Sequence, residues 1–302
     1  MTVQPRWPQP GAPQARAPQA RAPQPVDRSG TFPTAWARTR AAGVVREGVQ
    51  RWLMAPVVRS QVSVTVAGRE LLDGVSGPVV FVANHSSHLD TPVVLGALPR
   101  RWARRTVVAA AADYFFDVWW RAASTALALN TFPLERRGGR RSPTTPGDLL
   151  ADGWNLLIFA EGTRSEDGTI GPFKLGPAYL AVQAGLPVVP IALRGTYAAM
   201  PRDSRWPAPG RLPVTVRFGS PVVPAVGETP RQFAPRVRDA VVRLVAEDAG
   251  TWWEAQRAPS APVPRSATPV DAPGRWRAVW ESSQSPPRPR RRTVWRRTAR
   301  RR

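Results

Sequence analysis

Residues 78–90 read Pro-Val-Val-Phe-Val-Ala-Asn-His-Ser-Ser-His-Leu-Asp, an apolar run that ends in a short polar segment. A continuous apolar run of this length, bounded by proline and asparagine, is typical of a strand that is buried on both faces. Both histidines of the 302-residue chain, His85 and His88, follow the run directly. We therefore predict a central strand whose carboxyl end carries reactive side chains.

Further strand patterns, some continuously apolar and some alternating apolar with polar residues, recur along the chain and alternate with segments of helical pattern. We expect strands at about 62–66, 78–84, 106–110, 155–161, 188–193 and 214–218, and helices at about 34–59, 89–98, 113–129, 175–184 and 230–257. This alternation indicates an α/β fold, with a mostly parallel central sheet flanked by helices. In such sheets, functional sites gather at the carboxyl ends of the strands.

The two ends of the chain show no hydrophobic periodicity. Residues 1–30 contain a five-residue repeat rich in alanine and proline, and residues 258–302 are rich in proline, serine and arginine. Segments of this composition bury too little apolar surface to offset the entropy lost on ordering. We therefore expect two disordered basic tails around a single domain at 31–257, whose first element is an amphipathic helix at 31–60.

The formal net charge of +22 suggests an anionic partner. More than half of it lies in the two tails, and residues 258–302 alone hold twelve arginines interspersed with tryptophans. Such a tail suits an anionic membrane surface or nucleic acid, and a merely solvated tail is the alternative. The helix at 31–60 alternates arginines with valines and tryptophans, which is typical of a helix in a membrane interface, or of one that packs its apolar stripe on the domain. We favour a membrane surface over nucleic acid as the partner.

Several classes of site and of targeting are disfavoured by what the sequence lacks. The chain contains no cysteine, which excludes disulfides, zinc–thiolate sites and cysteine nucleophiles. It shows neither a signal-peptide pattern nor a run of about eighteen apolar residues that would span a membrane. We therefore expect a peripheral protein on the cytoplasmic side of the membrane.

Asp90 follows His85 by five residues, a spacing that decides how the two side chains can meet. In a continuous helix, five residues turn through about 500° and leave the side chains some 140° apart, so the pair can form only across a turn. A carboxylate that binds one imidazole nitrogen fixes the tautomer and leaves the other nitrogen free to take a proton from an alcohol. We interpret His85 as a general base, Asp90 as its orienting carboxylate and His88 as a neighbour.

Three other interpretations of this segment remain open. The pattern His-x-x-His-x-Asp offers three metal ligands, although at an unusual spacing. Ser86 or Ser87 offers a nucleophile for a histidine to activate, but the chain contains no G-x-S-x-G motif of the hydrolase type. A purely structural role for the histidines is the third.

Four blocks of sequence, in order and at plausible spacing, resemble those of the glycerolipid acyltransferases, the family of lysophosphatidic acid and glycerol-3-phosphate acyltransferases. They span about 79–195 of the chain, and the resembling segments are N-H-S-S-H-L-D at 84–90 (the family's HX4D motif), F-P-L-E-R at 132–136, F-A-E-G-T-R-S at 159–165, and F-K-L-G at 173–176 with G-L-P-V-V-P-I at 185–191. A single H-x4-D is a weak signal, whereas four blocks in order are a strong one.

The resemblance implies the family's fold and an O-acyltransferase activity. The acyl group of acyl-CoA or acyl-carrier protein would pass directly to a hydroxyl of a lysophospholipid, 1-acylglycerol-3-phosphate, in phospholipid biosynthesis. No metal and no cofactor beyond the thioester co-substrate is implied. His85 and Asp90 are the implied catalytic residues, and the implied substrate-binding residues are Arg136, Glu161, Gly162, Thr163, Arg164 and Lys174. A guanidinium group is suited to bidentate contacts with phosphate.

Two departures from the family pattern bear on the substrate. Ala160 replaces the usual proline of the third block. Alanines occupy 109–112, where many members resemble one another in a K-x-E-L segment whose lysine helps to bind the acceptor phosphate. Another lysophospholipid or a glycolipid is therefore an alternative acceptor, and a lipid or thioester hydrolase is an alternative activity. An arginine-rich binding protein with a decayed enzyme domain is a third possibility, which the four intact blocks disfavour.

Overall fold

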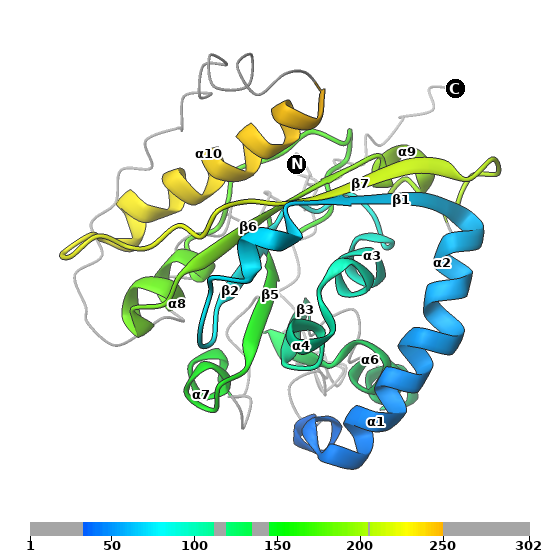
Figure 1. Ribbon diagram of the computed structural model, residues 1–302, viewed down its shortest axis with the longest axis horizontal. Helices are drawn as coiled ribbons and strands as arrows, with labels where there is room; N and C mark the ends of the chain where they lie inside the picture. Colours follow the sequence, from blue (N-terminus) through cyan, green and yellow to red (C-terminus); the bar gives the residue numbers. More distant parts are fainter. Residues whose placement is uncertain (1–32, 112–118, 135–144, 205, 250–302) are drawn as a thin grey trace, which may run out of the picture.

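A computed structural model describes residues 33–111, 119–134, 145–204 and 206–249 of the chain (Figure 1). The predictions for the tails, for Arg136 and for the alanine-to-aspartate junction at 112–113 lie outside these residues. So do the first part of the helix expected at 113–129 and the last part of the helix expected at 230–257.

A seven-stranded sheet forms the middle layer, in the order β1-β7-β6-β2-β5-β3-β4. The strands are β1 (Val62–Ala67), β2 (Val80–Ala83), β3 (Thr106–Ala111), β4 (Thr131–Leu134), β5 (Asn155–Phe159), β6 (Val188–Arg194) and β7 (Leu212–Phe218). Every neighbouring pair is parallel except β6 and β7, which are antiparallel. The expected mostly parallel sheet is confirmed, and β1 and β7 run opposite to the other five strands.

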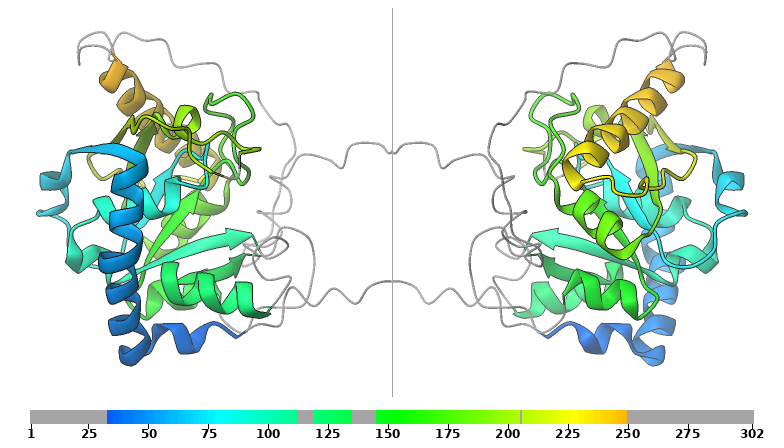
Figure 2. Two further views of the ribbon diagram at one scale, coloured as in Figure 1. Left: turned by 90° about the vertical axis from the view of Figure 1, so that its right-hand side faces the viewer. Right: turned by 90° about the vertical axis from the view of Figure 1, so that its left-hand side faces the viewer.

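Helices cover both faces of the sheet (Figures 1 and 2). The helices are α1 (Arg40–Gly48), α2 (Ala55–Gln61), α3 (Asp90–Ala97), α4 (Arg100–Ala103), α6 (Trp119–Leu129), α7 (Pro146–Ala151), α8 (Gly176–Ala184), α9 (Thr196–Ala199) and α10 (Pro230–Ala249), with 3-10 turns η1 (Ala35–Arg38) and η3 (Arg69–Leu72). Helices α7, α8 and α10 lie on one face, and α2, α3, α4 and α6 lie on the other. The α/β prediction is therefore confirmed as a three-layer arrangement.

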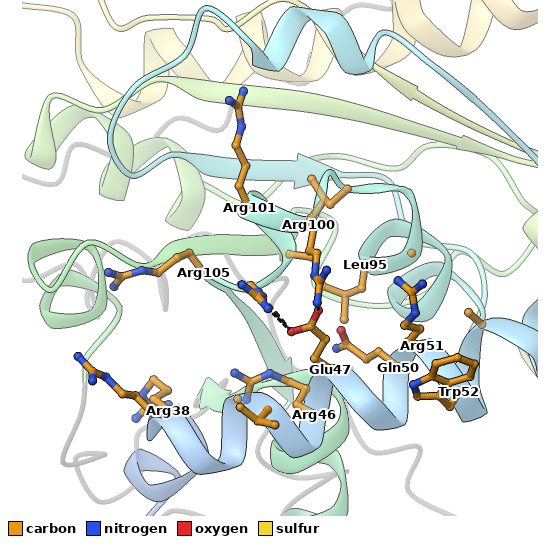
Figure 3. A pocket seen from close by; sticks show the side chains of 18 of the residues that line it. Arg38, Arg46, Glu47, Gln50, Arg51, Trp52, Leu95, Arg100, Arg101 and Arg105 are labelled. Atoms are coloured by element: carbon orange, nitrogen blue, oxygen red, sulfur yellow. Dashed lines mark hydrogen bonds and ion pairs between the residues drawn. The ribbon is translucent and has the colours of Figure 1, made fainter.

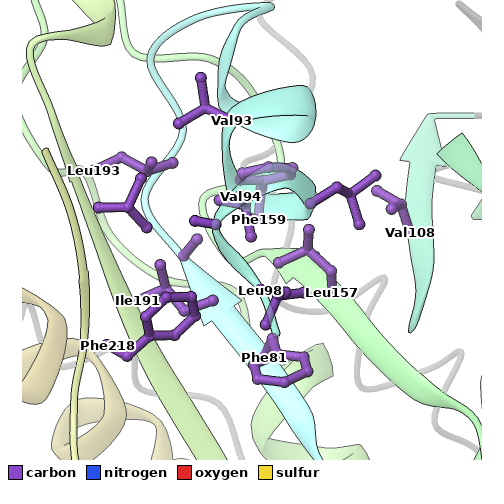
Figure 4. Close-up of a cluster of buried hydrophobic side chains, with 14 of the residues drawn as sticks. Phe81, Val93, Val94, Leu98, Val108, Leu157, Phe159, Ile191, Leu193 and Phe218 are labelled. Carbon is purple, nitrogen blue, oxygen red and sulfur yellow. The ribbon is translucent and has the colours of Figure 1, made fainter. Parts of the chain in front are cut away.

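The continuous apolar run at 79–83 is explained by this layering. Phe81 and Ala83 of β2 pack into the cluster beneath α3, which Figure 4 shows, whereas Val80 and Val82 pack into the cluster on the opposite face. All four side chains are fully buried. A strand covered on both faces needs apolar residues at every position rather than at alternate ones.

Helical turns occupy most of Ala35 to Gln61, close to the expected bounds, but the extended Thr39 separates η1 from α1 and the rest is not a uniform α-helix. Between α1 and α2 it widens into the π-helical turns η2 (Val49–Met54), where Ala55 N–H bonds to Gln50 O five residues back. Pro56 follows at once. Because a proline ring has no N–H and clashes with the carbonyl four residues earlier, a wider turn accommodates it.

Helix α7 is an element that hydrophobic periodicity did not reveal. Its first turn is closed by a capping box, in which the Thr145 hydroxyl accepts from Asp148 N–H and the Asp148 carboxylate accepts from Thr145 N–H. Pro146 occupies the first helical position. The pattern T-x-x-D with proline after threonine is a helix-start signal that the sequence does carry.

Candidate active site

The carboxyl ends of β2 and β5 bring the first and third sequence blocks together. The two strands pair in parallel, with Ala83 opposite Phe159. His85 follows the first strand by two residues and Glu161 follows the second by two residues. The residues predicted to share a strand edge therefore do so.

His85 and Asp90 form the hydrogen-bonded pair at the centre of this edge. Nδ1 of His85 lies 2.8 Å from Oδ2 of Asp90. The chain between them makes a turn and α3 begins at Asp90, so the five-residue spacing is bridged as the sequence argument requires. With Nδ1 engaged by the carboxylate, Nε2 is the nitrogen left to accept a proton from a substrate.

Asp90 is held more tightly than a pair with histidine alone would hold it. Its Oδ2 also accepts hydrogen bonds from the backbone N–H groups of Ser86 at 2.7 Å and Ser87 at 2.8 Å. The residue is completely buried. These bonds fix the orientation of the carboxylate, and through it the plane of the His85 ring.

The imidazole of His85 rests on an aromatic floor while part of it reaches solvent. Its ring stacks on Phe159 with centroids 4.2 Å apart and planes inclined by 22°. The side chain is 21% exposed. A base in this position is held in place by Phe159 on one face of its ring and remains accessible to a substrate.

Glu161 binds the backbone that carries His85. One of its oxygens accepts the His85 N–H at 2.8 Å, and the other accepts the Gly171 N–H at 2.9 Å. Burial raises the pKa of Glu161, and the two backbone hydrogen bonds partly oppose that rise. The sequence argument placed Glu161 against substrate or beside arginines, whereas this geometry gives it a positioning contact with the base.

The third block also holds His85 from its other side. Ser165 N–H donates to His85 O at 2.7 Å. Both backbone polar groups of His85 are therefore bonded to the segment 161–165.

Gly162 and Lys174 lie against each other beside this segment. Gly162 adopts a left-handed conformation with φ of 75°, and a Cβ there would stand 3.5 Å from two carbons of the Lys174 side chain. The Lys174 N–H donates to Ala160 O at 2.7 Å, which ties the F-K-L-G segment to the end of β5. The lone lysine of the chain is thereby placed at the same strand edge as His85.

Arg164 and His88 are neighbours near the base, and Arg164 carries the positive charge. Nη1 of the half-buried Arg164 donates to Arg202 O at 2.8 Å. Burial lowers the pKa of His88, and the nearby charges of Arg164 and His85 lower it further. Thr163 is exposed at the same edge. Of the six predicted substrate-binding residues, Glu161 bonds directly to His85, while Gly162, Thr163, Arg164 and Lys174 belong to segments that follow β5 on the same edge. Arg136 lies beyond the described residues, and the binding roles stay predictions.

Two scaffolding contacts were missed by the sequence argument. The Asn84 amide donates to Leu193 O at 2.9 Å and accepts from Leu193 N–H at 2.8 Å, and the Ser86 hydroxyl lies 3.0 Å from that of Thr196. These bonds tie the histidine loop to the end of β6. Asn84 was visible as the residue that ends the strand, but its partner lies 109 positions away.

Neither metal ligation nor membrane crossing finds a candidate within the described part of the chain. No three histidine, aspartate or glutamate side chains there come close enough together to hold a metal ion. No helix among the described residues combines the length and the apolar character needed to cross a bilayer.

The site lies in a segment that matches a protein-family model. A family model described as Acyltransferase matches residues 63–194, a segment that contains His85, Asp90, the whole third block and Lys174. The match covers less than half of the chain, and over this segment the chain is similar to acyltransferases. The matched segment contains all of the sequence blocks that resemble those of the glycerolipid acyltransferases.

Individual glycerolipid acyltransferases match over part of their length. A 1-acyl-sn-glycerol-3-phosphate acyltransferase of Chlamydomonas reinhardtii is 33% identical over 188 residues, which cover 61% of this chain and 52% of that one. A human 1-acyl-sn-glycerol-3-phosphate acyltransferase alpha is 32% identical over 183 residues, covering 57% and 60%. The chain thus spans about half of the first relative and three fifths of the second.

One solved structure shares the fold. It is the 1-acyl-sn-glycerophosphate acyltransferase PlsC from Thermotoga maritima, with a TM-score of 0.50 and 24% sequence identity. The match covers 70% of this chain and 91% of that one.

Proposed function

We propose that this protein is an O-acyltransferase that moves a fatty acyl group from acyl-CoA or acyl-carrier protein to a hydroxyl of a lysophospholipid, with 1-acylglycerol-3-phosphate as the acceptor in phospholipid biosynthesis. The observation that carries this proposal is the His85–Asp90 hydrogen bond at the carboxyl edge of the sheet. The acceptor is suggested by the names of the relatives, which are 1-acyl-sn-glycerol-3-phosphate acyltransferases.

In the proposed reaction, Nε2 of His85 takes the proton of the acceptor hydroxyl as its oxygen attacks the thioester carbonyl. Asp90 holds the ring in the required tautomer and stabilises the imidazolium that forms. The C–O bond forms as the C–S bond breaks, and the thiolate receives the proton from His85. The product is an ester and a free thiol, with no acyl-enzyme. Backbone N–H groups near the site would stabilise the tetrahedral oxyanion.

Binding of the acceptor phosphate is assigned to the cations beside this base. Arg164 and Lys174 belong to the segments that follow β5 at this strand edge, Thr163 of the same block is exposed, and Arg136 is retained as a prediction. Gly162 has no side chain, which lets a head group approach the backbone beside Lys174. A positioning role for Glu161 is added to the substrate role first assigned to it.

A second acceptor is favoured by one observation. Ala109–Ala111, which occupy the place of the family's lysine, form the end of β3 on the catalytic edge. Because alanine provides no cation there, we also propose another lysophospholipid or a glycolipid hydroxyl as acceptor.

We propose further that the protein works at a membrane surface, on its cytoplasmic side. Support comes from exposed apolar side chains along the N-terminal helices. Their exposed fractions are 73% for Val44, 77% for Trp52 and 61% for Leu53. Exposed tryptophan and leucine beside arginines are suited to the boundary between head groups and acyl chains.

The decisive experiment supplies labelled acyl-CoA with a mixed pool of lysolipids and identifies the products by mass spectrometry. A labelled diacyl product from 1-acylglycerol-3-phosphate supports the first acceptor, and a product from another lysolipid supports the second. Release of free fatty acid at the same rate without any acceptor would instead indicate a hydrolase. Parallel assays with acyl-carrier protein as donor identify the carrier.

A further inference from the structure

A large groove lies between the N-terminal helices and α4, and its volume is about 1070 Å³ (Figure 3). Glu47 is the single carboxylate among its lining residues. We call this groove the arginine groove, because nine arginines line it: Arg38, Arg40, Arg46, Arg51, Arg59, Arg100, Arg101, Arg104 and Arg105.

The α4 wall of the arginine groove is at the opposite edge of the sheet from the catalytic pair. Arg105 and Trp154 directly precede β3 and β5, whereas Glu161 follows β5 on the catalytic side. From Trp154 to Glu161 the chain advances seven residues, most of them in extended strand, which corresponds to about 20 Å at 3.3 Å per residue. A ligand held between α1 and Arg105 therefore cannot contact His85 unless it is very long.

Positive charge in the groove greatly exceeds the negative charge that faces it. The Glu47 carboxylate bonds to Arg104 at 2.6 Å and also pairs with Arg100. Arg101 pairs with Asp73 outside the groove wall at 2.9 Å. The positive charge that these ion pairs do not neutralise lies on both walls of the groove, and it repels itself across the groove.

Arg46 gives this excess a buried component. It is only 4% exposed, and its Nη1 donates to the Ala37 carbonyl oxygen at 2.7 Å. Burial lowers the pKa of Arg46, and the neighbouring charge of Arg38 lowers it further. A buried cation whose described hydrogen-bond partner is a neutral carbonyl is costly, and a bound anion would offset that cost.

Aromatic rings fix two of the guanidinium groups. Arg105 lies over the ring of Trp154 and Arg51 over the ring of Trp52, each with the guanidinium carbon 5.5 Å from the ring centre. Such stacking limits the motion of a guanidinium group while leaving its N–H donors free to bind oxygen.

We propose that the arginine groove binds phosphate groups, as an anion site separate from the catalytic one. Planar guanidinium groups on two facing walls match the several oxygens of a phosphate better than they match a single carboxylate. The phosphate belongs either to a soluble phosphorylated compound or to the head group of an anionic phospholipid. Exposed Trp52 and Val44 at the groove provide the apolar surface that a lipid would also contact.

The test compares full-length variants by direct binding of two probes, inorganic pyrophosphate in solution and vesicles that contain phosphatidic acid in phosphatidylcholine. The groove variant is Arg40→Gln with Arg105→Gln, which removes one charge from each wall. The control is Arg231→Gln with Arg243→Gln on α10, which removes the same charge from the opposite face of the sheet. The control is essential because a chain of net charge +22 attracts phosphate everywhere.

We expect the groove variant to bind at least about tenfold more weakly, as the loss of two charge-assisted contacts implies, and the control to change little. Glu47→Gln should bind more tightly than the parent, because it frees Arg100 and Arg104 and removes the lining carboxylate. His85→Ala should bind like the parent. Loss with both probes indicates recognition of phosphate itself, and loss with vesicles alone indicates a lipid head group.

The proposal is overturned if the groove variant and the control weaken binding equally, or if neither changes it. It is also overturned if Glu47→Gln folds normally and binds no more tightly. Thermal unfolding of each variant, measured without ligand, separates lost binding from lost structure. The catalytic proposal is tested by acyl transfer to dispersed lysolipid and can fail or succeed independently.

Discussion

Glu161 accepts a hydrogen bond from the backbone N–H of His85, 76 positions earlier in the chain, at a distance of 2.8 Å. The same carboxylate reaches Gly171 with its other oxygen. The third sequence block thus holds the first block by its main chain, while Asp90 holds the imidazole ring. The placement of the base depends on two carboxylates with different tasks.

Replacement of His85 by alanine should lower kcat for acyl transfer by about 10²- to 10⁴-fold, the usual contribution of a general base. His88→Gln serves as the matched control and should lower kcat by less than about tenfold, because the Asp90 carboxylate is bonded to His85. Steady-state kinetics with labelled acyl-CoA provide the measurement. Full activity of His85→Ala would exclude the mechanism.

Asp90→Asn should reduce both kcat and stability. The amide keeps the shape of the carboxylate, and its oxygen can take the place of Oδ2, but without the negative charge it accepts the three hydrogen bonds more weakly and no longer stabilises an imidazolium. Its buried NH₂ group then lies at the position of Oδ1, for which no hydrogen-bond partner is described, and a buried donor without a partner costs about 1–3 kcal/mol in the free energy of unfolding. Chemical denaturation and kinetics on the same preparation measure the two effects. A variant with normal stability and normal kcat would remove Asp90 from the catalytic pair.

Glu161→Gln should change how stability depends on pH. Because burial raises the pKa of Glu161 above its ordinary value of 4.5, the folded protein retains a proton that the unfolded chain has released. The free energy of unfolding of the parent should therefore fall, relative to the variant, as pH rises from 4.5 through the raised pKa. Urea denaturation of both proteins across this range measures the difference. A difference that is constant with pH would show that Glu161 titrates normally in the folded state.

Two glycines of the catalytic edge should respond differently to alanine. Gly195 has φ of 87°, and a Cβ there would stand 2.1 Å from Pro213 O, so Gly195→Ala should cost more than about 3 kcal/mol. Gly162 has a similar φ, but its Cβ would make only ordinary contacts with Lys174. Gly162→Ala should therefore cost about 1–2 kcal/mol, the strain of a left-handed backbone. Thermal unfolding orders the two variants, and equal losses would contradict the clash at Gly195.

The exposed apolar residues of η2 should contribute to membrane binding. Trp52→Ser with Leu53→Ser should weaken binding to neutral phosphatidylcholine vesicles at least about tenfold, because each buried side chain contributes about 1.5–3 kcal/mol. Val223→Ser with Val226→Ser, two valines that are also exposed and lie between β7 and α10, is the control and should have little effect. Sedimentation with vesicles measures both. Equal losses in the two variants would show that this surface is not the one that contacts lipid.

Much of the fold follows from local sequence pattern. The runs that form β2 and β5 are rich in apolar residues because helices cover both faces of the sheet. Such burial can be predicted from the sequence without knowing which strands and helices pack against each run. The reversal of β7 against β6 is different. The alternation of apolar and polar residues in β7 predicts a strand, but it does not predict whether that strand is parallel or antiparallel to β6. The direction depends on the connection between the two strands.

The His85–Asp90 pair could be predicted from the sequence because both residues lie within one turn of the chain. The five-residue spacing of His85 and Asp90 admits few geometries, and the turn between them is the one that forms. The bonds of Glu161 to His85, and of Asn84 to Leu193, join residues 76 and 109 positions apart. Nothing local in the sequence specifies such partners, so the roles of these two side chains emerged only from the folded chain.

The π-helical turns of η2 have a consequence for insertions and deletions. A π-helical turn contains more residues than an α-helical turn for nearly the same advance along the helix axis. The segment 49–54 is therefore longer in sequence than an α-helix spanning the same distance would be. The Gln50 side chain secures one end of this segment to Ala128 O, and α2 leads straight into β1 at the other. Removing one residue here would tighten the helix and rotate α1 about its axis, changing which of its side chains face α6, while β1 kept its register in the sheet.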